Sequence, residues 1–310
     1  MDDFIFFDAE SEYSAGESFI AAIGVFDGVH TGHRKIIETA AALAKEHHCR
    51  VLALSFSPHP RALLCPDQPP ELLVSEKSRC ELLRDAGADI CGFINFTSRA
   101  AALSPEDFLL ELRDHAPVDI CGITVGNNWK FGRNGSGNRN TLEKFCSANR
   151  WFLNTVEEVT LEDRTVSSTA IRCAIASGFL PLAVKMLGRN ISLAGTVTHG
   201  FQIAGSKLEA PTANLDVKYG VLPPDGVYSG CCTIDGILYP AAVNIGLAPT
   251  FGNGLRRVEI HLLDFKGSLY DREITLEINS FIRPERRFAS PGELKAQIAA
   301  DIAAIRRTVK

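Results

Sequence analysis

The sequence predicts an α/β domain of parallel strands, followed by a small antiparallel β-barrel and a C-terminal helix. Its 310 residues suffice for two packed domains, each with its own core. In the first half, short apolar runs alternate with longer amphipathic segments, whereas strand-like segments separated by Gly and Pro turns fill the second half. The pattern changes near Gly188, so we expect domains at 1–188 and 189–310.

The first domain is expected to consist of βαβ units with helices on both faces of a parallel sheet. Uninterrupted apolar runs predict buried strands, and apolar residues spaced three or four apart predict helices. Ser104 is a candidate cap for one helix. The expected strands are 20–26, 51–56, 90–96 and 120–125, and the expected helices are 32–45, 77–85, 105–113, 167–176 and 179–187.

The second domain carries several short strand-like segments between positions 191 and 282. In VEIHLL, the apolar residues Val258, Ile260 and Leu262 alternate with Glu259 and His261, so one face of the barrel should carry polar groups. Ser290 and Pro291 then begin a helix with which the chain ends.

Composition and charge exclude several classes of protein. Lys and Arg number 32 against 37 Asp and Glu, so no basic surplus exists to bind a polyphosphate backbone, and we expect no nucleic-acid partner. No apolar run approaches the ~18 residues of a membrane span, and no secretion signal opens the chain. Nine cysteines without a C-x-x-C pair favour reduced core thiols in the cytoplasm. The oligomeric state is not indicated.

A glycine-rich turn, GVFDGVHTGHR, joins the first predicted strand to the first predicted helix. Gly24, Gly28 and Gly32 allow a tight turn and close approach of a ligand to the backbone. The helix N-terminus attracts phosphate, and His30 and His33 add ring donors. A zinc site lacks acidic or thiol partners nearby, and a capping loop with incidental histidines is the other alternative.

A second phosphate-binding candidate, VSSTAIR, opens a later predicted helix. Ser168 and Thr169 supply hydroxyl groups at the helix start, and Arg172 follows one turn later on the same face. Taken alone, this pattern also fits an ordinary serine cap.

Together the two motifs resemble the HxGH nucleotidylyltransferase superfamily, and the chain is similar to the prokaryotic bifunctional riboflavin kinase/FAD synthetase family. The resemblance covers nearly the whole chain and implies a Rossmann-like nucleotidylyltransferase domain followed by a six-stranded kinase barrel. The similar segments are GVFDGVHTGHR (24–34), SFSPHPR (55–61), VGNNWKFG (125–132), VSSTAIR (166–172), PTANL (211–215), VNIGLAPTFG (243–252), VEIHLLDF (258–265) and FIRPERRF (281–288).

For the first domain, the resemblance implies an FMN adenylyltransferase, which joins FMN to the AMP part of ATP and releases pyrophosphate. It implies catalytic roles for His30, His33 and Arg172. Trp129 stands where the family has Phe, and either stacks on a ring or packs in the core. The resemblance further implies ATP binding by Gly24, Phe26, Asp27, Gly32, Ser168 and Thr169, and flavin binding by His59 and Asn128. A purely structural role for Asp27 remains open.

For the second domain, the resemblance implies riboflavin kinase, which phosphorylates the 5′-hydroxyl of riboflavin with ATP. Thr212 and Asn214 match the residues that organise Mg²⁺ and ATP, and their oxygen atoms are hard donors suited to that ion. Glu259 matches the general base. The expected small molecules are therefore ATP, riboflavin, FMN and FAD, with Mg²⁺ as cofactor.

The kinase motif departs from the family where the chain reads GSKLEAPTAN. Ser206, Glu209 and Ala210 replace the usual Arg, Gly and Phe, and Ala248 replaces another Arg. A carboxylate in a phosphate loop would repel phosphate. The alternative is therefore an FAD synthetase alone, whose barrel serves flavin binding or assembly. A transferase for another phosphate compound and a flavin sensor are two further hypotheses.

Overall fold

The computed structural model describes residues 4–198, 213–247, 256–286 and 288–308. The chain forms two compact units. The first unit comprises Met1–Pro70 and Glu76–Ser167, and the second comprises Glu71–Ser75 and Ser168–Lys310. The domain boundary at 188/189 remains a prediction.

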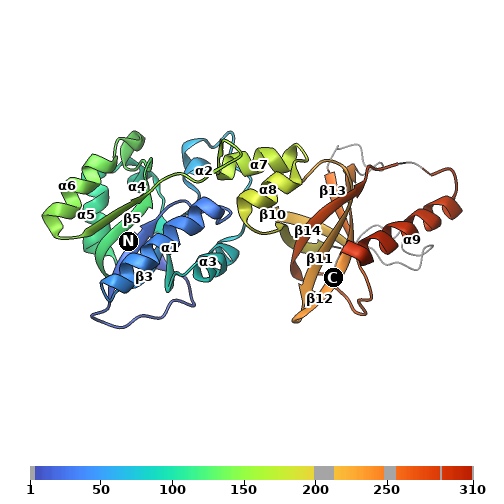
Figure 1. Cartoon of the computed structure of the whole chain (residues 1–310), viewed down its shortest axis with the longest axis horizontal. Helices are drawn as coiled ribbons and strands as arrows, with labels where there is room; N and C mark the ends of the chain where they lie inside the picture. The colour runs from blue at the N-terminus through green and yellow to red at the C-terminus, as the bar shows by residue number, and fades with distance from the viewer. Residues whose placement is uncertain (1–3, 199–212, 248–255, 287, 309–310) are drawn as a thin grey trace. The chain divides into compact units, whose positions relative to one another are not determined.

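The first unit is built on a six-stranded sheet in the order β1-β4-β3-β2-β5-β6. Figure 1 labels β3 and β5 of this sheet. β1 runs antiparallel to β4, and all other neighbours are parallel, which confirms the predicted parallel sheet. The short strands β1 and β6 were not predicted. The strands are β1 (Ile5–Phe7), β2 (Ser18–Ile23), β3 (Arg50–Ser57), β4 (Ile90–Asn95), β5 (Asp119–Gly126) and β6 (Phe152–Val156).

Helices cover both faces of this sheet, as predicted. On one face, α1 (Thr31–Glu46) and α3 (Glu76–Asp85) contribute Ile37 and Leu83 to an apolar core. On the other face, α5 (Pro105–His115) and α6 (Arg139–Asn149) contribute apolar side chains to a second core. The Ser104 hydroxyl accepts the Asp107 N–H at 3.0 Å and caps α5. The remaining elements are α2 (Pro60–Leu64), α4 (Ser98–Ala102), the 3₁₀ turn η1 (Arg133–Gly135) and the hairpin β7 (Thr160–Leu161) with β8 (Arg164–Thr165).

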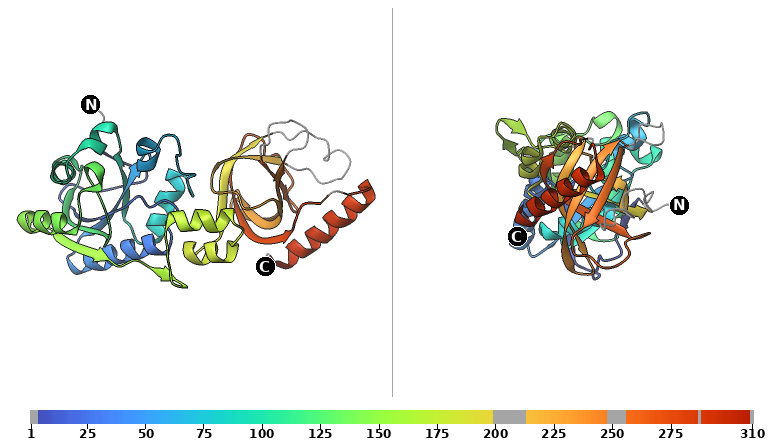
Figure 2. Two further views of the ribbon diagram at one scale, coloured as in Figure 1. Left: turned by 90° about the horizontal axis from the view of Figure 1, so that it is seen from above. Right: turned by 90° about the vertical axis from the view of Figure 1, so that its right-hand side faces the viewer.

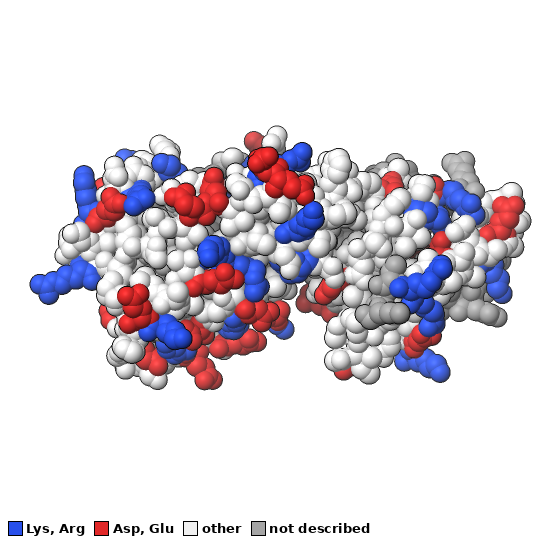
Figure 3. Space-filling view, in the orientation of Figure 1, with Lys and Arg blue, Asp and Glu red and all other residues white. Residues whose placement is uncertain are grey.

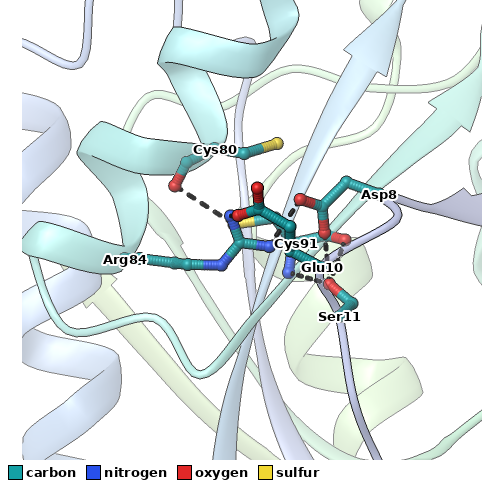
Figure 4. Close-up of polar contacts among 6 residues, drawn as sticks. All are labelled: Asp8, Glu10, Ser11, Cys80, Arg84 and Cys91. Carbon is teal, nitrogen blue, oxygen red and sulfur yellow. Dashed lines mark hydrogen bonds and ion pairs between the residues drawn. The ribbon is translucent and has the colours of Figure 1, made fainter. Parts of the chain in front are cut away.

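A polar cluster ties the segment after β1 to α3 and β4 (Figure 4). The Arg84 guanidinium binds the carboxylates of both Asp8 and Glu10. The Ser11 hydroxyl donates to the Cys91 carbonyl and accepts the Cys91 N–H, each at 3.0 Å. These bonds hold the single antiparallel strand of the sheet against its neighbour.

The second unit contains a closed barrel in the order β10-β13-β12-β11-β14-β9, which Figure 2 shows as a ring. All neighbouring strands are antiparallel, as predicted. The elements are α7 (Ser168–Ala176), α8 (Leu180–Leu187), β9 (Ile191–Thr198), β10 (Ala213–Tyr219), β11 (Gly226–Ile234), β12 (Ile237–Leu247), β13 (Arg256–Leu262), β14 (Glu273–Arg283) and α9 (Pro291–Thr308).

Alternation along the strands separates the barrel interior from its outer face. Val258, Ile260 and Leu262 are buried, whereas Glu259 and His261 are half-buried, which confirms the predicted polar face. The C-terminal helix α9 is tied to the end of β14 by an ion pair. There the Arg283 guanidinium donates to both oxygens of the buried Asp301 carboxylate. Such a two-pronged pair fixes the helix orientation as well as its position.

The cysteines only partly match the prediction of core thiols. Five of them are buried, but the prediction is wrong for Cys65 and Cys173, which are exposed, and for Cys49 and Cys121, which are half-buried. Cys65 ends the short helix α2, which buries no residue. An apolar neighbourhood in sequence therefore did not guarantee a buried thiol.

Acidic and basic side chains are interspersed on the face of the molecule drawn in Figure 3. No helix within the described residues is long and apolar enough to cross a membrane.

Candidate functional site

The strand order of the first unit reverses between β2 and β5. The chain runs from β2 to β3 and β4 on one side, and through β5 to β6 on the other. In open α/β sheets, ligands bind in the crevice outside the carboxyl ends of the strands at such a switch point. The loops that leave β2 and β5 at this edge contain the predicted residues His30 and Asn128.

The loop at 24–30, which we call the nucleotide loop, has an unusual backbone. Phe26, Gly28 and Val29 have positive φ angles of 51°, 82° and 38°. The Val29 N–H closes the turn by donating to the Phe26 carbonyl at 3.1 Å. A Cβ on Gly24 would lie 2.8 Å from the Phe26 ring, so this position requires glycine. Left-handed non-glycine residues tend to gather at functional sites, where the surrounding structure enforces them.

The two histidines form a stacked pair at the start of α1. Their ring centroids are 3.5 Å apart, and the planes meet at 20°. Nδ1 of His30 accepts the N–H of His33 at 3.3 Å, so the neutral His30 ring carries its proton on Nε2. Phe26 packs edge-on against His33, with centroids 5.3 Å apart. The rings are thus held at a helix N-terminus, where backbone N–H groups favour a phosphate.

A buried arginine, which sequence reasoning missed, supports the nucleotide loop. The Ser55 hydroxyl donates to the Val25 carbonyl at 2.7 Å. Nη1 of Arg79 donates to the Ser55 hydroxyl at 2.9 Å and to the Phe56 carbonyl at 3.2 Å. Arg79 is only 1% exposed. The signal in the sequence was the position of Arg79 next to Cys80 and one turn before Leu83, on the apolar face of α3. A charged side chain buried on such a face needs specific hydrogen-bond partners.

Other predicted residues of the first unit lie at the same edge of the sheet. His59 follows β3 and caps α2, because its Nδ1 accepts the Arg61 N–H at 3.1 Å. Asn128 follows β5, is exposed and donates to the Glu158 carboxylate. Asp27 is fully buried in the nucleotide loop. Since β3, β2 and β5 are parallel neighbours, their loops leave the same edge of the sheet.

Trp129 packs mainly as a core residue. Its ring stacks on Phe131 at a centroid distance of 4.6 Å and an angle of 16°. It also meets the edge of Phe108. One face of the half-buried indole is therefore already occupied by protein.

Ser168, Thr169 and Arg172 lie in the second unit, on the first turns of α7. Ser168 and Arg172 are half-buried, and Thr169 is exposed. Nε of Arg172 donates to the Glu71 carbonyl at 2.7 Å. The predicted spacing of one helical turn between the hydroxyl groups and the guanidinium is present.

Three polar residues form a row across neighbouring strands of the barrel, which we call the barrel row. Glu259 of β13 pairs with Asn214 of β10 on one side and with Asn244 of β12 on the other. Residues paired in register point to the same face, so all three lie on the outer face of the barrel. Asn244 was not predicted. Thr212, Ser206, Lys207, Glu209, Ala210 and Ala248 lie outside the described residues.

The barrel row places a carboxylate in a partly desolvated position. Burial raises the pKa of Glu259, Arg257 lowers it and the Glu285 carboxylate raises it. Glu285 accepts the Asn244 Nδ2–H at 3.1 Å and covers Gly246, where a Cβ would collide with its carboxylate. A carboxylate with a raised pKa is a better proton acceptor once ionised. Glu285, like Asn244, became identifiable only through the fold.

Two family models match the chain in succession. The model described as FAD synthetase matches residues 13–170, and the model described as riboflavin kinase matches residues 187–309. A solved structure from Streptococcus pneumoniae, described as a macrolide-efflux protein, is 25% identical with a TM-score of 0.83. It covers 94% of this chain and 95% of its own. This likeness extends over both units of the fold.

Curated relatives match over nearly the full length. The bifunctional riboflavin kinase/FMN adenylyltransferase of Pseudomonas fluorescens is 36% identical and covers 93% of this chain and 92% of its own. Proteins of the same description from Escherichia coli K12 and Bacillus subtilis 168 are 33% and 31% identical. The E. coli protein covers 92% of this chain and 91% of its own, and the B. subtilis protein 91% and 90%. The chain therefore belongs to the family of bifunctional riboflavin kinase/FMN adenylyltransferases.

Proposed function

We propose that the nucleotide loop and the barrel row carry the two activities of the family in this chain: adenylylation of FMN and phosphorylation of riboflavin. The chain is an enzyme with an FAD synthetase part and a riboflavin kinase part. The observation that supports the assignment of the first site is the stacked pair of His30 and His33 at the sheet's switch point.

Adenylyl transfer needs positioning more than proton chemistry. An oxygen of the FMN phosphate attacks the α-phosphorus of ATP, the bond to the leaving pyrophosphate breaks, and no side chain becomes a covalent intermediate. The enzyme must bring two repelling anions into line and neutralise charge that develops on the leaving group. In our proposal His30 and His33 donate to the ATP phosphates, and the α1 N-terminus contributes further N–H groups.

The other predicted residues complete the same proposal. The ATP-binding turn is shaped by Gly24, Phe26, Asp27 and Gly32. The two glycines leave room for the rings, because a Cβ at Gly24 would lie 2.8 Å from the Phe26 ring and a Cβ at Gly32 would lie 3.2 Å from the His30 ring. His59 and Asn128 contact the flavin or its phosphate. Ser168, Thr169 and Arg172 of α7 hold the triphosphate and the leaving pyrophosphate, as hydroxyl groups and a guanidinium can.

The barrel row supports a phosphoryl transfer with Glu259 as general base. Its carboxylate takes the proton of the riboflavin 5′-hydroxyl while the hydroxyl oxygen attacks the γ-phosphorus of ATP, and ADP leaves. The Asn244 side-chain amide donates a hydrogen bond to the Glu285 carboxylate, and we assign both as positioning residues for Glu259. The raised pKa of Glu259 suits this role, since burial makes the carboxylate more basic.

Mg²⁺ fits the donor chemistry of the barrel row. Asn214 offers an amide oxygen beside the Glu259 carboxylate, and the described residues contain no group of three acidic, His or Cys side chains for a metal. Mg²⁺ commonly takes few protein ligands and several phosphate oxygens. Thr212 and Asn214 would hold the ion, which would shield phosphate charge.

The FAD-synthetase-only alternative is not favoured. The riboflavin kinase model matches residues 187–309, and the curated relatives are described as bifunctional. The domains at 1–188 and 189–310 and a cytoplasmic location remain part of the proposal. Nine unbridged cysteines support that location.

The test is to incubate the full chain with Mg-ATP and either riboflavin or FMN, and to separate the products. We expect riboflavin to give FMN and then FAD, and FMN to give FAD with pyrophosphate. His33→Ala should strongly slow only the conversion of FMN to FAD, and Glu259→Gln only the conversion of riboflavin to FMN. Failure of riboflavin to give FMN, while FMN still gives FAD, would refute the kinase assignment.

A further inference from the structure

Two cysteine thiols of the first unit lie side by side at the edge of the sheet opposite to the nucleotide loop. The Sγ atoms of Cys49 and Cys121 are 3.2 Å apart. Cys49 immediately precedes β3, and Cys121 is near the start of β5. Since β3, β2 and β5 are parallel, this edge holds their amino ends, whereas the nucleotide loop follows the carboxyl end of β2.

The pair differs from the other cysteines of the described chain. Cys49 and Cys121 are both half-buried, so a small oxidant can reach them. Cys80 and Cys91 are also close in the fold, but both are buried, and the Cys91 thiol donates to the Cys80 carbonyl. Accessibility favours oxidation of a thiol, and a facing partner thiol allows the oxidised sulfur to be captured as a disulfide.

The backbone holds both sulfur atoms in place. The Cys49 thiol contacts the His47 carbonyl and the Cys121 thiol contacts the Phe19 carbonyl, each at 3.4 Å. A disulfide needs a sulfur–sulfur distance of about 2.05 Å, so each sulfur has to move by roughly half an ångström.

We propose that Cys49 and Cys121 form a reversible disulfide, which makes this edge of the sheet a redox modification site. With a small disulfide such as oxidised glutathione, the Cys49 thiolate attacks one sulfur of the oxidant and expels one thiolate. The Cys121 thiolate then attacks the Cys49 sulfur of the mixed disulfide and expels the second. The chain loses two protons and two electrons, and the oxidant becomes two thiols.

The environment of Cys121 supports this order of attack. Burial, and next the contact with Cys49, raise the pKa of Cys121 to about 12. The thiolate is the nucleophile, so Cys121 is poorly suited to the first attack and suited to resolution after Cys49 has been oxidised.

The bridge would stabilise the first unit without reaching its site. It would join the chain before β3 to β5 across β2, and cross-links of this kind restrict the unfolded chain. Cys121 lies five residues before Gly126, the last residue of β5, which at about 3.3 Å per residue is roughly 17 Å from that edge. Oxidation should raise the thermal midpoint by several degrees and leave the rate of FAD formation within about twofold.

The experiment uses the full chain with Cys65→Ser and Cys173→Ser, which removes the two exposed thiols. After treatment with oxidised glutathione, peptide mapping should show a Cys49–Cys121 cross-link, and the intact mass should fall by two hydrogen atoms. Reduction with dithiothreitol should reverse both changes. Adding Cys49→Ser or Cys121→Ser should abolish the cross-link and the rise in thermal midpoint.

Separate glutathione adducts on Cys49 and Cys121 without a cross-link would overturn the proposal. So would recovery of both thiols unchanged under conditions that oxidise a buffer dithiol completely. A tenfold loss of FAD formation in the cross-linked protein would refute the claim that the bridge is remote from the site. The mapping requires no turnover, so its outcome is independent of the proposed function.

Discussion

The nucleotide loop and the barrel row reach their geometry in opposite ways. The loop is one continuous stretch at 24–30 that is almost wholly buried and held by Ser55 and Arg79 beneath it. The barrel row takes Asn214, Asn244 and Glu259 from three different strands, aligned only by their register. The first site therefore depends on a local turn and its core support, whereas the second depends on strand pairing.

Glu259→Gln gives the sharpest separation of the two regions. The isosteric amide keeps the barrel but cannot accept the hydroxyl proton, and general bases contribute on the order of 10²–10⁴ to rate. We expect FMN formation from riboflavin to fall by that factor, with FAD formation from FMN unchanged, as measured by product separation. An equal loss of both conversions would contradict the independence of the two sites.

His33→Ala is the reciprocal change in the nucleotide loop. Loss of one donor to developing phosphate charge lowers kcat by roughly 10²–10³, so FAD formation should fall while FMN formation persists. His48→Asn is the matched control, because His48 is exposed at the far end of α1 and asparagine tolerates its positive φ of 55°. If the control loses as much activity, the effect comes from α1 as a whole.

Ser55→Ala tests the support beneath the loop. It leaves the buried Arg79 Nη1 and the Val25 carbonyl short of a hydrogen-bond partner, which costs about 1–3 kcal/mol in the free energy of unfolding. We also expect a raised KM for ATP in FAD formation. The control is Ser229→Ala, which removes another buried hydroxyl, bonded to Ser280 in the barrel. The assignment fails if the KM for ATP in FAD formation rises equally in both variants.

The pH dependence of Glu259 should produce the smallest effect. Because burial raises its pKa above the ordinary value of 4.5, the folded chain is penalised when this carboxyl ionises, and that penalty grows as pH rises through the raised pKa. Glu259→Gln should therefore be slightly more stable than the parent at neutral pH, with the difference vanishing below the ordinary value. Thermal unfolding at several pH values measures it.

The same pKa should appear in the kinase kinetics. The base acts in its ionised form, so kcat/KM for riboflavin should fall on acidification at a higher pH than an ordinary carboxyl would give. This fall in kcat/KM on acidification should be absent from the residual activity of Glu259→Gln. A fall that persists unchanged in Glu259→Gln would assign the proton acceptor to another group.

Much of the fold could be predicted from local patterns. Helix α5 begins at Pro105, directly after its Ser104 cap. Buried and half-buried residues alternate along β13, as the spacing of its apolar residues predicts. Prediction missed α6, which Asn138 caps, and β1, whose three residues are held by pairing with β4. Short edge strands depend on distant partners, which a local pattern does not contain.

The candidate site divides in the same manner. His30 and His33 could be found because the turn, the glycines and the helix start are contiguous in sequence. Arg79 supports the loop from another helix, and Asn244 meets Glu259 through barrel register, so neither contact exists until the chain has folded. The altered positions of the kinase motif, Ser206, Glu209, Ala210 and Ala248, lie outside the described residues. The riboflavin assay tests whether they affect the kinase activity.

The stack of Trp129 on Phe131 has a practical consequence. The sequence contains two tryptophans, Trp129 and Trp151, and both belong to the first unit. Trp129 touches Phe131 and Phe108, so its emission should shift to longer wavelength when that packing opens to water. Tryptophan fluorescence is therefore a selective reporter: it follows melting of the adenylylating half, because the barrel half has tyrosines but no tryptophan.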